Sequence, residues 1–222
     1  MTYTILSYER EGATPDMYWV ELRGGCTGLL KPEVSGLDLL CENEYAAVAE
    51  FFGLKVSRCI RLDSGHFVSL AGRLPDCEMV DAYDVAEDNS FELYRGRISA
   101  EAYQKLLLLA FVDGVTLQSD RHQGNIAFCG NGSNITDLYP PYDNVACLRN
   151  SYSRVARLGP VGRSCTHEEV FRWLRSNQAQ FGCLYDSYMS ESFTHLAETL
   201  STDSCEILLA QRERVRRCMS AV

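Results

Sequence analysis

The sequence predicts an α+β protein in two lobes, a small β-rich N-terminal lobe with one helix and a mainly helical C-terminal lobe. Three observations lead to this prediction. Strand-forming residues and tight turns are concentrated at the start of the chain, the pattern becomes strongly helical after Ser99, and a polar segment at residues 119–144 interrupts the helical part. We place the two lobes at residues 1–75 and 76–222.

The N-terminal lobe is expected to contain two hairpins and one helix. Each hairpin consists of two β-rich stretches separated by a glycine-containing turn. Between the hairpins, residues 38–52 place apolar side chains at helical spacing, and Gly53 follows as a residue suited to the end of a helix. These elements predict a small sheet with one helix packed on it. The four strands are expected at residues 17–22, 27–31, 59–62 and 66–70.

Helices dominate the expected C-terminal lobe. Ser99 is suited to cap a helix over residues 100–117, which contains a continuous apolar run. Thr166 and Glu169 have the spacing of a capping box in front of a second helix. The remaining expectations are helices at about 178–200 and 203–219 and an irregular connection at 71–98.

The composition restricts the classes of function. The formal net charge is −9, so a general nucleic-acid-binding surface is not expected. The arginine-rich stretch at residues 212–217 suits the solvated end of a helix. No apolar run approaches the length of a membrane span, and the polar N-terminus does not resemble a signal peptide. We therefore expect a cytoplasmic protein that binds neither nucleic acid nor membrane.

Ten cysteines raise the question of disulfides or a metal centre. None of them belongs to a Cys-x-x-Cys pair, and the chain contains four histidines. Structural zinc sites need clustered cysteine or histidine ligands, so the pattern does not indicate one. Buried free thiols are expected in preference to a disulfide framework.

The residues that suggest chemistry lie in segment 119–144. This segment follows the long apolar helix and contains Asp120, Asn125 and Asp143, with two short β-like runs between the last two. Phosphoryl transfer to a hydroxyl needs a carboxylate near the acceptor oxygen and oxygen ligands that hold Mg²⁺ against nucleotide phosphates. An Asp and an Asn on one loop can divide these roles, and an Asp after a hairpin can reach the metal from the other side. Such residues are also common in turns, but their combination with the helix, the hairpin and a strand lysine favours catalysis.

This segment contains two motifs, Asp120-Arg121-His122-Gln123-Gly124-Asn125 and Pro141-Tyr142-Asp143-Asn144. They resemble those of the HipA-like serine/threonine kinases, which are bacterial kinases of toxin–antitoxin modules and related stand-alone effectors. Asp113, in the preceding helix, also matches the family pattern. The resemblance is good over residues 103–148 and weak over 10–70, and the compact, stand-alone members are the most similar. It implies a two-lobed protein-kinase-like fold and a protein substrate with a serine or threonine acceptor.

The same resemblance assigns roles in binding ATP and Mg²⁺. Asp120 would be the catalytic base, and Asn125 and Asp143 would bind Mg²⁺. His122 would fix the loop in place and would not act as the base.

Contacts with ATP are implied for two residues of the N-terminal lobe, Lys31 and Gly12. A glutamate of the 38–52 helix should pair with Lys31. Glu42 and Glu44 are both candidates: counting back from Gly53 favours Glu42, whereas the match of the local Asn-Glu-Tyr run favours Glu44, and of the two we expect Glu42.

One departure from the family concerns regulation. The family's nucleotide loop carries a serine whose autophosphorylation inactivates the enzyme, and Glu11 stands at that place here. A carboxylate cannot be phosphorylated, so this route of inactivation is not expected. The family also implies an antitoxin-type protein partner, and either a cytoplasmic location or delivery to another cell as an effector.

Two other functions fit the motifs. The Asp-Arg-His-x-x-Asn loop also resembles that of phosphatidylinositol 3- and 4-kinases, although the acidic chain lacks a basic amphipathic face for an anionic membrane. A pseudokinase that serves as a nucleotide-binding regulatory module is the other alternative. The complete set of polar residues for chemistry argues against it, and the unusual nucleotide loop argues for it.

Overall fold

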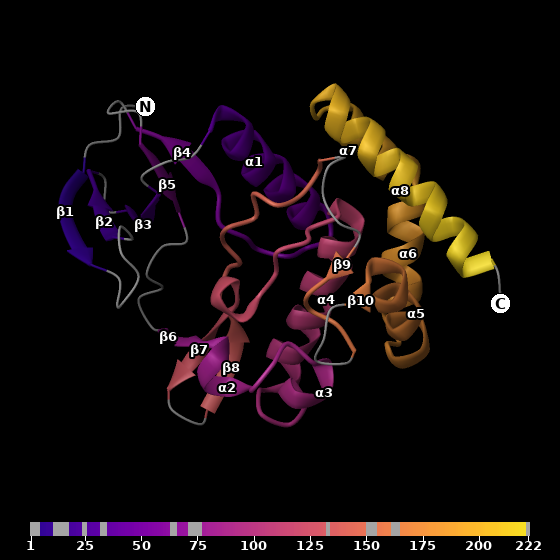
Figure 1. Cartoon of the computed structure of the whole chain (residues 1–222), viewed down its shortest axis with the longest axis horizontal. Helices are drawn as coiled ribbons and strands as arrows, with labels where there is room; N and C mark the ends of the chain where they lie inside the picture. The colour runs from indigo at the N-terminus through magenta and orange to yellow at the C-terminus, as the bar shows by residue number, and fades with distance from the viewer. Residues whose placement is uncertain are drawn as a thin grey trace.

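The computed structural model describes residues 5–10, 18–23, 26–31, 35–62, 66–70, 77–131, 134–149, 155–160 and 165–220. Strands of the N-terminal lobe form a sheet at one end of the molecule, and helices occupy the other end (Figure 1). Helix α1 (Gly36–Phe51) lies between these two parts. The α+β class and the division into a β-rich N-terminal lobe and a helical C-terminal lobe are confirmed. The boundary expected between residues 75 and 76 lies outside the described residues and stays a prediction.

The N-terminal sheet has five strands in the order β1-β2-β3-β5-β4, all antiparallel. Both expected hairpins are present, and β1 is an additional strand that the sequence pattern did not predict. Gly28 permits the close approach of β3 and β5, because a Cβ atom at this position would clash with Val68 Cγ1. The strands are β1 (Ile5–Arg10), β2 (Tyr18–Leu22), β3 (Cys26–Lys31), β4 (Cys59–Arg61) and β5 (Phe67–Ser69).

Helix α1 begins at a capping box that Ser35 and Asp38 form, two residues earlier than expected. It ends before Gly53, whose φ of 82° is readily adopted by glycine, as predicted. Its buried apolar side chains, including Tyr45 and Val48, belong to the large core of the C-terminal lobe. The sheet has a separate small core. The expectation that this helix packs on the sheet therefore describes only part of its surroundings.

The C-terminal lobe opens with a three-stranded antiparallel sheet in the order β6-β7-β8. Its first strand lies in the segment 71–98 that was expected to be irregular, together with two short helices. The elements are β6 (Glu78–Asp81), α2 (Ala82–Val85), α3 (Phe91–Tyr94), β7 (Ala127–Asn131) and β8 (Asn134–Leu138).

Helix α4 (Ala100–Thr116) crosses the core of the C-terminal lobe, and Ser99 caps it as predicted by accepting a hydrogen bond from Ala102 N. Phe111 of this helix packs edge to face against Phe171 of α5. The capping box of Thr166 and Glu169 is confirmed at the start of α5.

The helical character expected at 178–200 is confirmed, but it is divided between two helices, because Ser190 ends one helix and caps the next. The remaining elements are β9 (Val155–Ala156), β10 (Cys165–Thr166), α5 (His167–Asn177), α6 (Phe181–Met189), α7 (Glu191–Glu198) and α8 (Thr202–Ser220).

The cysteines differ from expectation at one place. Cys77, just before β6, and Cys129 of β7 form a disulfide across a sequence separation of 52 residues, so the expectation of free thiols is wrong for this pair. Four other cysteines are buried free thiols, as predicted: Cys41, Cys59, Cys147 and Cys165.

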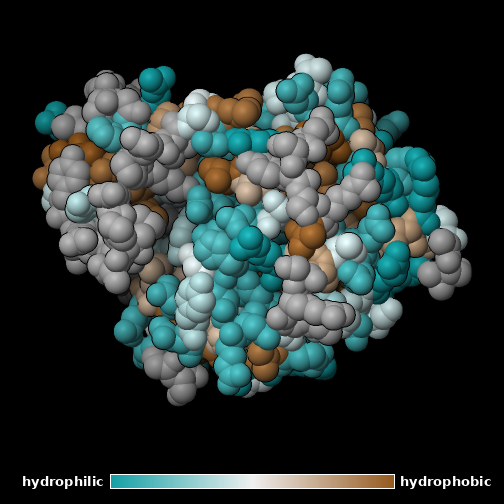
Figure 2. Space-filling view, in the orientation of Figure 1, coloured by the Kyte–Doolittle hydropathy of each residue, from teal (hydrophilic) through white to brown (hydrophobic). Residues whose placement is uncertain are grey.

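The surface agrees with the acidic composition. Its centre is hydrophilic in the view of Figure 2, and the hydrophobic residues are in small separate groups. Within the described ranges, no helix has both the length and the apolar character needed to cross a membrane.

Candidate active site

The candidate site is built around the buried guanidinium of Arg121, whose side chain is 1% exposed. This guanidinium makes a bidentate ion pair with Asp113 of α4, with both N–O distances at 3.1 Å. Tyr45 of α1 completes the group, because its hydroxyl donates to Asp113 Oδ1 (2.7 Å) and accepts from Arg121 Nη2 (3.2 Å). A buried charge is tolerable only with such partners.

The protonation states of this group follow from its surroundings. Burial opposes the charge on Arg121, but Asp113 and Tyr45 beside it outweigh this effect and raise its pKa. Burial, with Asp113 next to it, raises the pKa of Tyr45 well above the usual value. Arg121 therefore stays charged and Tyr45 stays a hydrogen-bond donor at any physiological pH.

Arg121 also brings together the two motifs of the sequence. Its Nη1 atom donates to the backbone oxygen of Asn125 (3.3 Å) and to that of Tyr142 (3.1 Å), and its Nη2 atom donates to Asn144 Oδ1 (2.5 Å). Since Asp120 precedes Arg121 and Asp143 lies between Tyr142 and Asn144, one buried side chain fixes the backbone on which all three predicted residues stand.

Asp120 is half-exposed, with 45% of its side chain accessible. Its backbone N–H donates to Gln118 Oε1 (3.2 Å). Two basic side chains face its carboxylate: Arg157 Nη1 lies 3.1 Å from Oδ1, and His122 Nε2 lies 4.0 Å from Oδ2. An accessible carboxylate on a fixed backbone is suited to meet an acceptor hydroxyl.

Asn125 closes the short 3₁₀ turn η1 (Gln123–Asn125). Its Nδ2 atom donates to the backbone oxygen of Asp120 at 2.8 Å, which leaves Oδ1 as the atom that the amide can offer to a metal. His122 accepts a hydrogen bond from Gly124 N through Nδ1 (3.0 Å), so its ring stabilises this turn.

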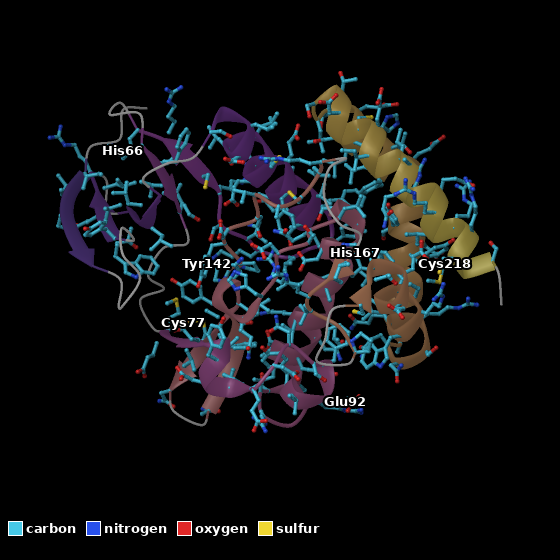
Figure 3. All side chains as sticks on the ribbon, in the orientation of Figure 1. His66, Cys77, Glu92, Tyr142, His167 and Cys218 are labelled. Atoms are coloured by element: carbon cyan, nitrogen blue, oxygen red, sulfur yellow. A yellow bond between two sulfur atoms is a disulfide. The ribbon has the colours of Figure 1, made fainter. Side chains whose placement is uncertain are left out.

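Asp143 is half-buried and has a φ of 59°, in the left-handed region. Asp and Asn adopt this conformation more readily than most residues. Neighbouring backbone contacts fix the loop: Ser57 N donates to Pro141 O (3.0 Å), and Ser119 N donates to Ala146 O (3.1 Å). Tyr142, on the N-terminal side of Asp143, lies at the junction of the two lobes (Figure 3).

The two predicted metal ligands fit Mg²⁺ better than a metal held by protein alone. Across the described part of the chain, no cluster of three or more acidic, histidine or cysteine side chains could hold a metal. Mg²⁺ is normally held by one or two protein oxygens and completes its shell with waters and phosphates. Asn125 Oδ1 and the Asp143 carboxylate match this requirement.

The two glutamates of α1 have different surroundings. Glu42 is buried and accepts a hydrogen bond from Asn144 Nδ2 (3.0 Å), next to Asp143. Glu44 faces the start of α8, where it accepts from Ser201 N (2.6 Å) and Ser204 Oγ (2.5 Å). Glu42 therefore lies on the side of the candidate site, and Glu44 serves to cap a helix of the C-terminal lobe.

Two predicted ATP contacts lie partly or wholly outside the described residues. Gly12, with Glu11, is among the residues that the structure does not describe. For Lys31 the backbone is described, at the end of β3 and opposite Phe67 of β5, but its side chain is not.

An apolar cluster joins the N-terminal sheet to the C-terminal lobe beside Asp143, and we call it the bridging cluster. Trp19 and Leu29 come from the sheet, and the other members come from the C-terminal lobe. The cluster consists of Trp19, Leu29, Ala127, Cys129, Tyr139 and Tyr142. Its members are all buried against one another, so the cluster packs the two parts of the molecule together beside the candidate site. It was not predicted, because no spacing in the sequence connects residues so far apart.

Arg157 and the partners of Arg121 were also missed as site residues. Arg121 itself stands inside the Asp-Arg-His motif, and Asn144 follows Asp143, so proximity to the motifs was the available signal. For Arg157 the sequence offered no signal, because 37 positions separate it from Asp120 (157 minus 120).

No family model matches the sequence, and no curated protein matches it. Solved structures do match. CtkA, a proinflammatory kinase of Helicobacter pylori, superimposes with a TM-score of 0.63 at 12% identity, over 99% of this chain and 97% of CtkA. HipA of a Shewanella oneidensis toxin–antitoxin system, solved with HipB and operator DNA, gives 0.54 at 14% identity, over 99% of this chain and 64% of HipA. These likenesses establish a kinase-like fold.

Proposed function

We propose that the protein is an ATP- and Mg²⁺-dependent phosphotransferase, and most specifically a HipA-like kinase of protein serine or threonine residues. One observation carries the proposal: the buried Arg121 guanidinium holds together the backbone segments of Asp120, Asn125 and Asp143. The kinase-like fold supports it, because these are the residues that phosphoryl transfer requires on such a fold.

The chain's own residues divide the reaction as follows. Asp120 orients the acceptor hydroxyl and takes its proton as the new O–P bond forms. The bond between the γ-phosphorus and the bridging oxygen breaks, and its electron pair leaves with ADP. Asn125 and Asp143 would hold Mg²⁺, which when bound neutralises phosphate charge. Lys31 and Gly12 are proposed to contact the phosphates, with Glu42 as the carboxylate that pairs with Lys31.

A protein acceptor is favoured over an inositol lipid by the charge pattern of the surface. The arginine-rich end of α8 is the most basic stretch of the chain, but Arg216 and Arg217 pair with Glu213 of the same helix. Arg212 instead donates to Ser190 O and Thr194 Oγ1. These contacts leave the stretch with positive charge, but the chain as a whole carries a formal net charge of −9, which an anionic membrane repels.

The chain spans 97% of CtkA and 64% of HipA, and the compact, stand-alone type of HipA-like kinase that the motifs resemble belongs to the proposal. We also propose an antitoxin-type partner, because HipA was solved together with HipB. Co-purification from cells tests for this partner. A cytoplasmic site of action, in the producing cell or after delivery to another cell, is proposed with it.

The direct test uses labelled ATP and Mg²⁺, with the protein alone and with a cell lysate. The parent should transfer label to serine or threonine of a protein, and Asp120→Asn and Asp143→Asn should both lose transfer. Asp143→Asn is preferred to alanine because asparagine tolerates the left-handed backbone at this position. Asp186→Asn, on the exposed face of α6, is the matched control and should transfer at the parent rate.

Nucleotide binding separates a pseudokinase from an enzyme whose acceptor is absent from the assay. ATP with Mg²⁺ at 100 times its dissociation constant should add about 2.7 kcal/mol to the unfolding free energy. Binding without transfer to any protein, peptide or lipid would support the regulatory module, and the absence of binding would overturn both readings. Label in inositol lipid and not in protein would reassign the acceptor.

The same substitution at each of the two glutamates of α1 gives a matched pair of variants that tests the proposed pairing of Glu42 with Lys31. Glu42→Gln should weaken nucleotide binding and transfer with little change in helix α8. Glu44→Gln removes the acceptor at the start of α8 and should lower the unfolding free energy by about 1 kcal/mol while transfer is retained. Isothermal titration with ATP and urea unfolding measure the two effects, and an exchange of phenotypes would assign the pairing carboxylate to Glu44.

A further inference from the structure

The segment around Arg157 has a fixed backbone. Strand β9, which ends just before Arg157, pairs with β10, and the neighbours Ala156 and Leu158 are both buried. Gly159 then hydrogen-bonds in both directions to the turn before α3: its N–H donates to Asn89 O (3.2 Å), and its oxygen accepts from Phe91 N (2.9 Å). Buried neighbours on both sides and paired backbone groups limit the movement of this segment.

The same turn contacts the loop that carries Asp120. Asn89 Nδ2 donates to the backbone oxygen of Arg121 at 2.9 Å, and Tyr94 OH donates to Asn89 Oδ1 at 3.0 Å. Asn89 thus links the segment of Arg157 with the loop of Asp120 through its backbone and its side chain. The backbone segments that carry the two residues are therefore held next to each other by contacts that do not depend on the ion pair.

The side chain of Arg157 differs from that of Arg121 in its accessibility. Arg157 is 51% exposed and Nη1 lies 3.1 Å from Asp120 Oδ1, whereas Arg121 is buried and its donors are used by five partners. A guanidinium has five N–H donors in a planar fork, so it can contact a carboxylate and a phosphoryl group at the same time.

The charges of the site favour a further cation at this place. Asp120, Asp143 and Glu42 are acidic, and the reaction adds the charge of a nucleotide and spreads negative charge over the transferred group. Among the described side chains, Arg157 is the accessible arginine that contacts the proposed base. Preorganised donors directed at developing charge are a large source of catalysis.

We propose that Arg157 is a further catalytic residue, which holds the Asp120 carboxylate and donates to the transferring phosphoryl group. The assignment rests on the proposed phosphotransferase function and deepens it. As the acceptor oxygen forms its bond to phosphorus, its proton passes to Asp120, and the bond to the ADP oxygen breaks with its electron pair. Arg157 exchanges no proton in this step and acts by its charge.

A binding experiment tests this role without knowledge of the acceptor. The probes are Mg·ADP alone and Mg·ADP with aluminium fluoride, which imitates the phosphoryl group in transfer. Arg157→Met should leave the dissociation constant of Mg·ADP within about twofold of the parent and should weaken the aluminium fluoride complex about 100-fold. Arg157→Lys should restore part of the loss, because it keeps the charge but not the fork. The control is Arg172→Met, which removes an exposed arginine paired with Glu168 on α5 and should bind both probes as the parent does.

The outcomes distinguish this inference from the proposed function. Equal binding of the aluminium fluoride complex by the parent and Arg157→Met would overturn the role of Arg157 while the kinase proposal stands. Faster transfer by Arg157→Met would also overturn it, because the contact with Asp120 would then be inhibitory. Failure of the parent to bind Mg·ADP would overturn the proposed function, and the role of Arg157 with it.

Discussion

The N-terminal sheet and the C-terminal lobe differ in how they are held together. The sheet has its own small core of five buried residues: Val20, Leu22, Leu30, Leu62 and Val68. The core of the C-terminal lobe extends from α1 to α8 and contains several interlocked aromatic rings, among them Phe52, Phe111 and Phe193. Buried apolar area is the main source of stability, so we expect the sheet to be the weaker part.

The difference shows which part fixes the candidate chemistry. Helix α1 precedes two strands of the sheet in sequence, yet it shares the core of the C-terminal lobe, and it supplies Tyr45 and Glu42 to the polar group around Arg121. The site residues that the structure describes in full therefore stand on the stable part. The sheet, which carries Lys31, contacts that part through the bridging cluster.

The largest effect is expected where a buried charge loses its partner. Arg121→Met leaves the Asp113 carboxylate buried beside Tyr45 and removes the donors of the site loops. We expect a loss of about 3–5 kcal/mol in the free energy of unfolding, measured by urea titration of the helical circular dichroism signal.

The control for this prediction is the exposed pair of Arg217 and Glu213 on α8. Arg217→Met should change the unfolding free energy by less than about 1 kcal/mol. Similar losses for the two variants would contradict the view that the polar group around Arg121 supports the C-terminal lobe.

The disulfide comes next in size. Cys77 and Cys129 close a long loop within the C-terminal lobe, and such a link typically contributes about 2–4 kcal/mol. Dithiothreitol should lower the urea midpoint of the parent. Cys77→Ser should unfold at about the midpoint of the reduced parent, both with and without dithiothreitol. A response of Cys77→Ser to dithiothreitol equal to that of the parent would show that this disulfide is not the source of the effect.

Acid should act on the C-terminal lobe through His167. This side chain is buried, and burial lowers its pKa to about 4. The unfolded chain binds a proton near pH 6.5 and the folded chain only near pH 4, so stability falls as the pH falls through this window. The full loss below pH 4 is about 3 kcal/mol.

Two variants isolate this effect from the titration of carboxyl groups. His167→Leu should show a flatter dependence of the unfolding free energy between pH 6.5 and pH 4 than the parent. His195→Gln, on the exposed surface of α7, should follow the parent curve. Parallel curves for the parent and His167→Leu would show that His167 binds its proton equally well in the folded state.

The smallest expected loss of stability tests whether the N-terminal sheet is less stable than the C-terminal lobe. Val68→Ala removes two methyl groups from the small core of the sheet and should cost about 1–2 kcal/mol there. Hydrogen exchange should show the loss in the amides of β3 and β5, while those of α4 keep their protection.

The matched variant is Val115→Ala, which makes the same deletion in the core of the C-terminal lobe. It should lower the protection of α4 as well as that of the sheet. Equal losses in α4 for both variants would mean that the two parts unfold as one unit.

Local patterns in the sequence predicted much of the secondary structure. The caps of α4 and α5 and the glycine after α1 depend on residues within a few positions of each other, and the two hairpins depend on their turns. The break at Ser190 was missed because the helical spacing continues across it. Strand β1 was missed because its pairing partner is more than seven residues away.

Contacts between distant segments could not be predicted in the same way. The three polar residues of the motifs were recognised from the chemistry that they suit, and their roles stay predictions. The partners that hold them were not recognised: Tyr45 meets Asp113 across 68 positions, and Asn144 meets Glu42 across 102. Such pairs depend on how whole elements pack, and a single sequence carries no periodic signal for that.

Two leucines at the ends of the site segment suggest how this protein would respond to redesign. Leu117 (φ 57°) ends α4 and Leu148 (φ 52°) follows the Asp143 loop, and Leu148 N donates to Thr116 O at 2.9 Å. A left-handed backbone costs a leucine about 1–2 kcal/mol that glycine would avoid. A designer who idealised the backbone would place glycine at both positions, giving up the buried leucine side chains. That choice would relieve the local backbone strain, but it would loosen the two junctions that close the loop of Asp120, Asn125 and Asp143, and with them the geometry of the candidate site.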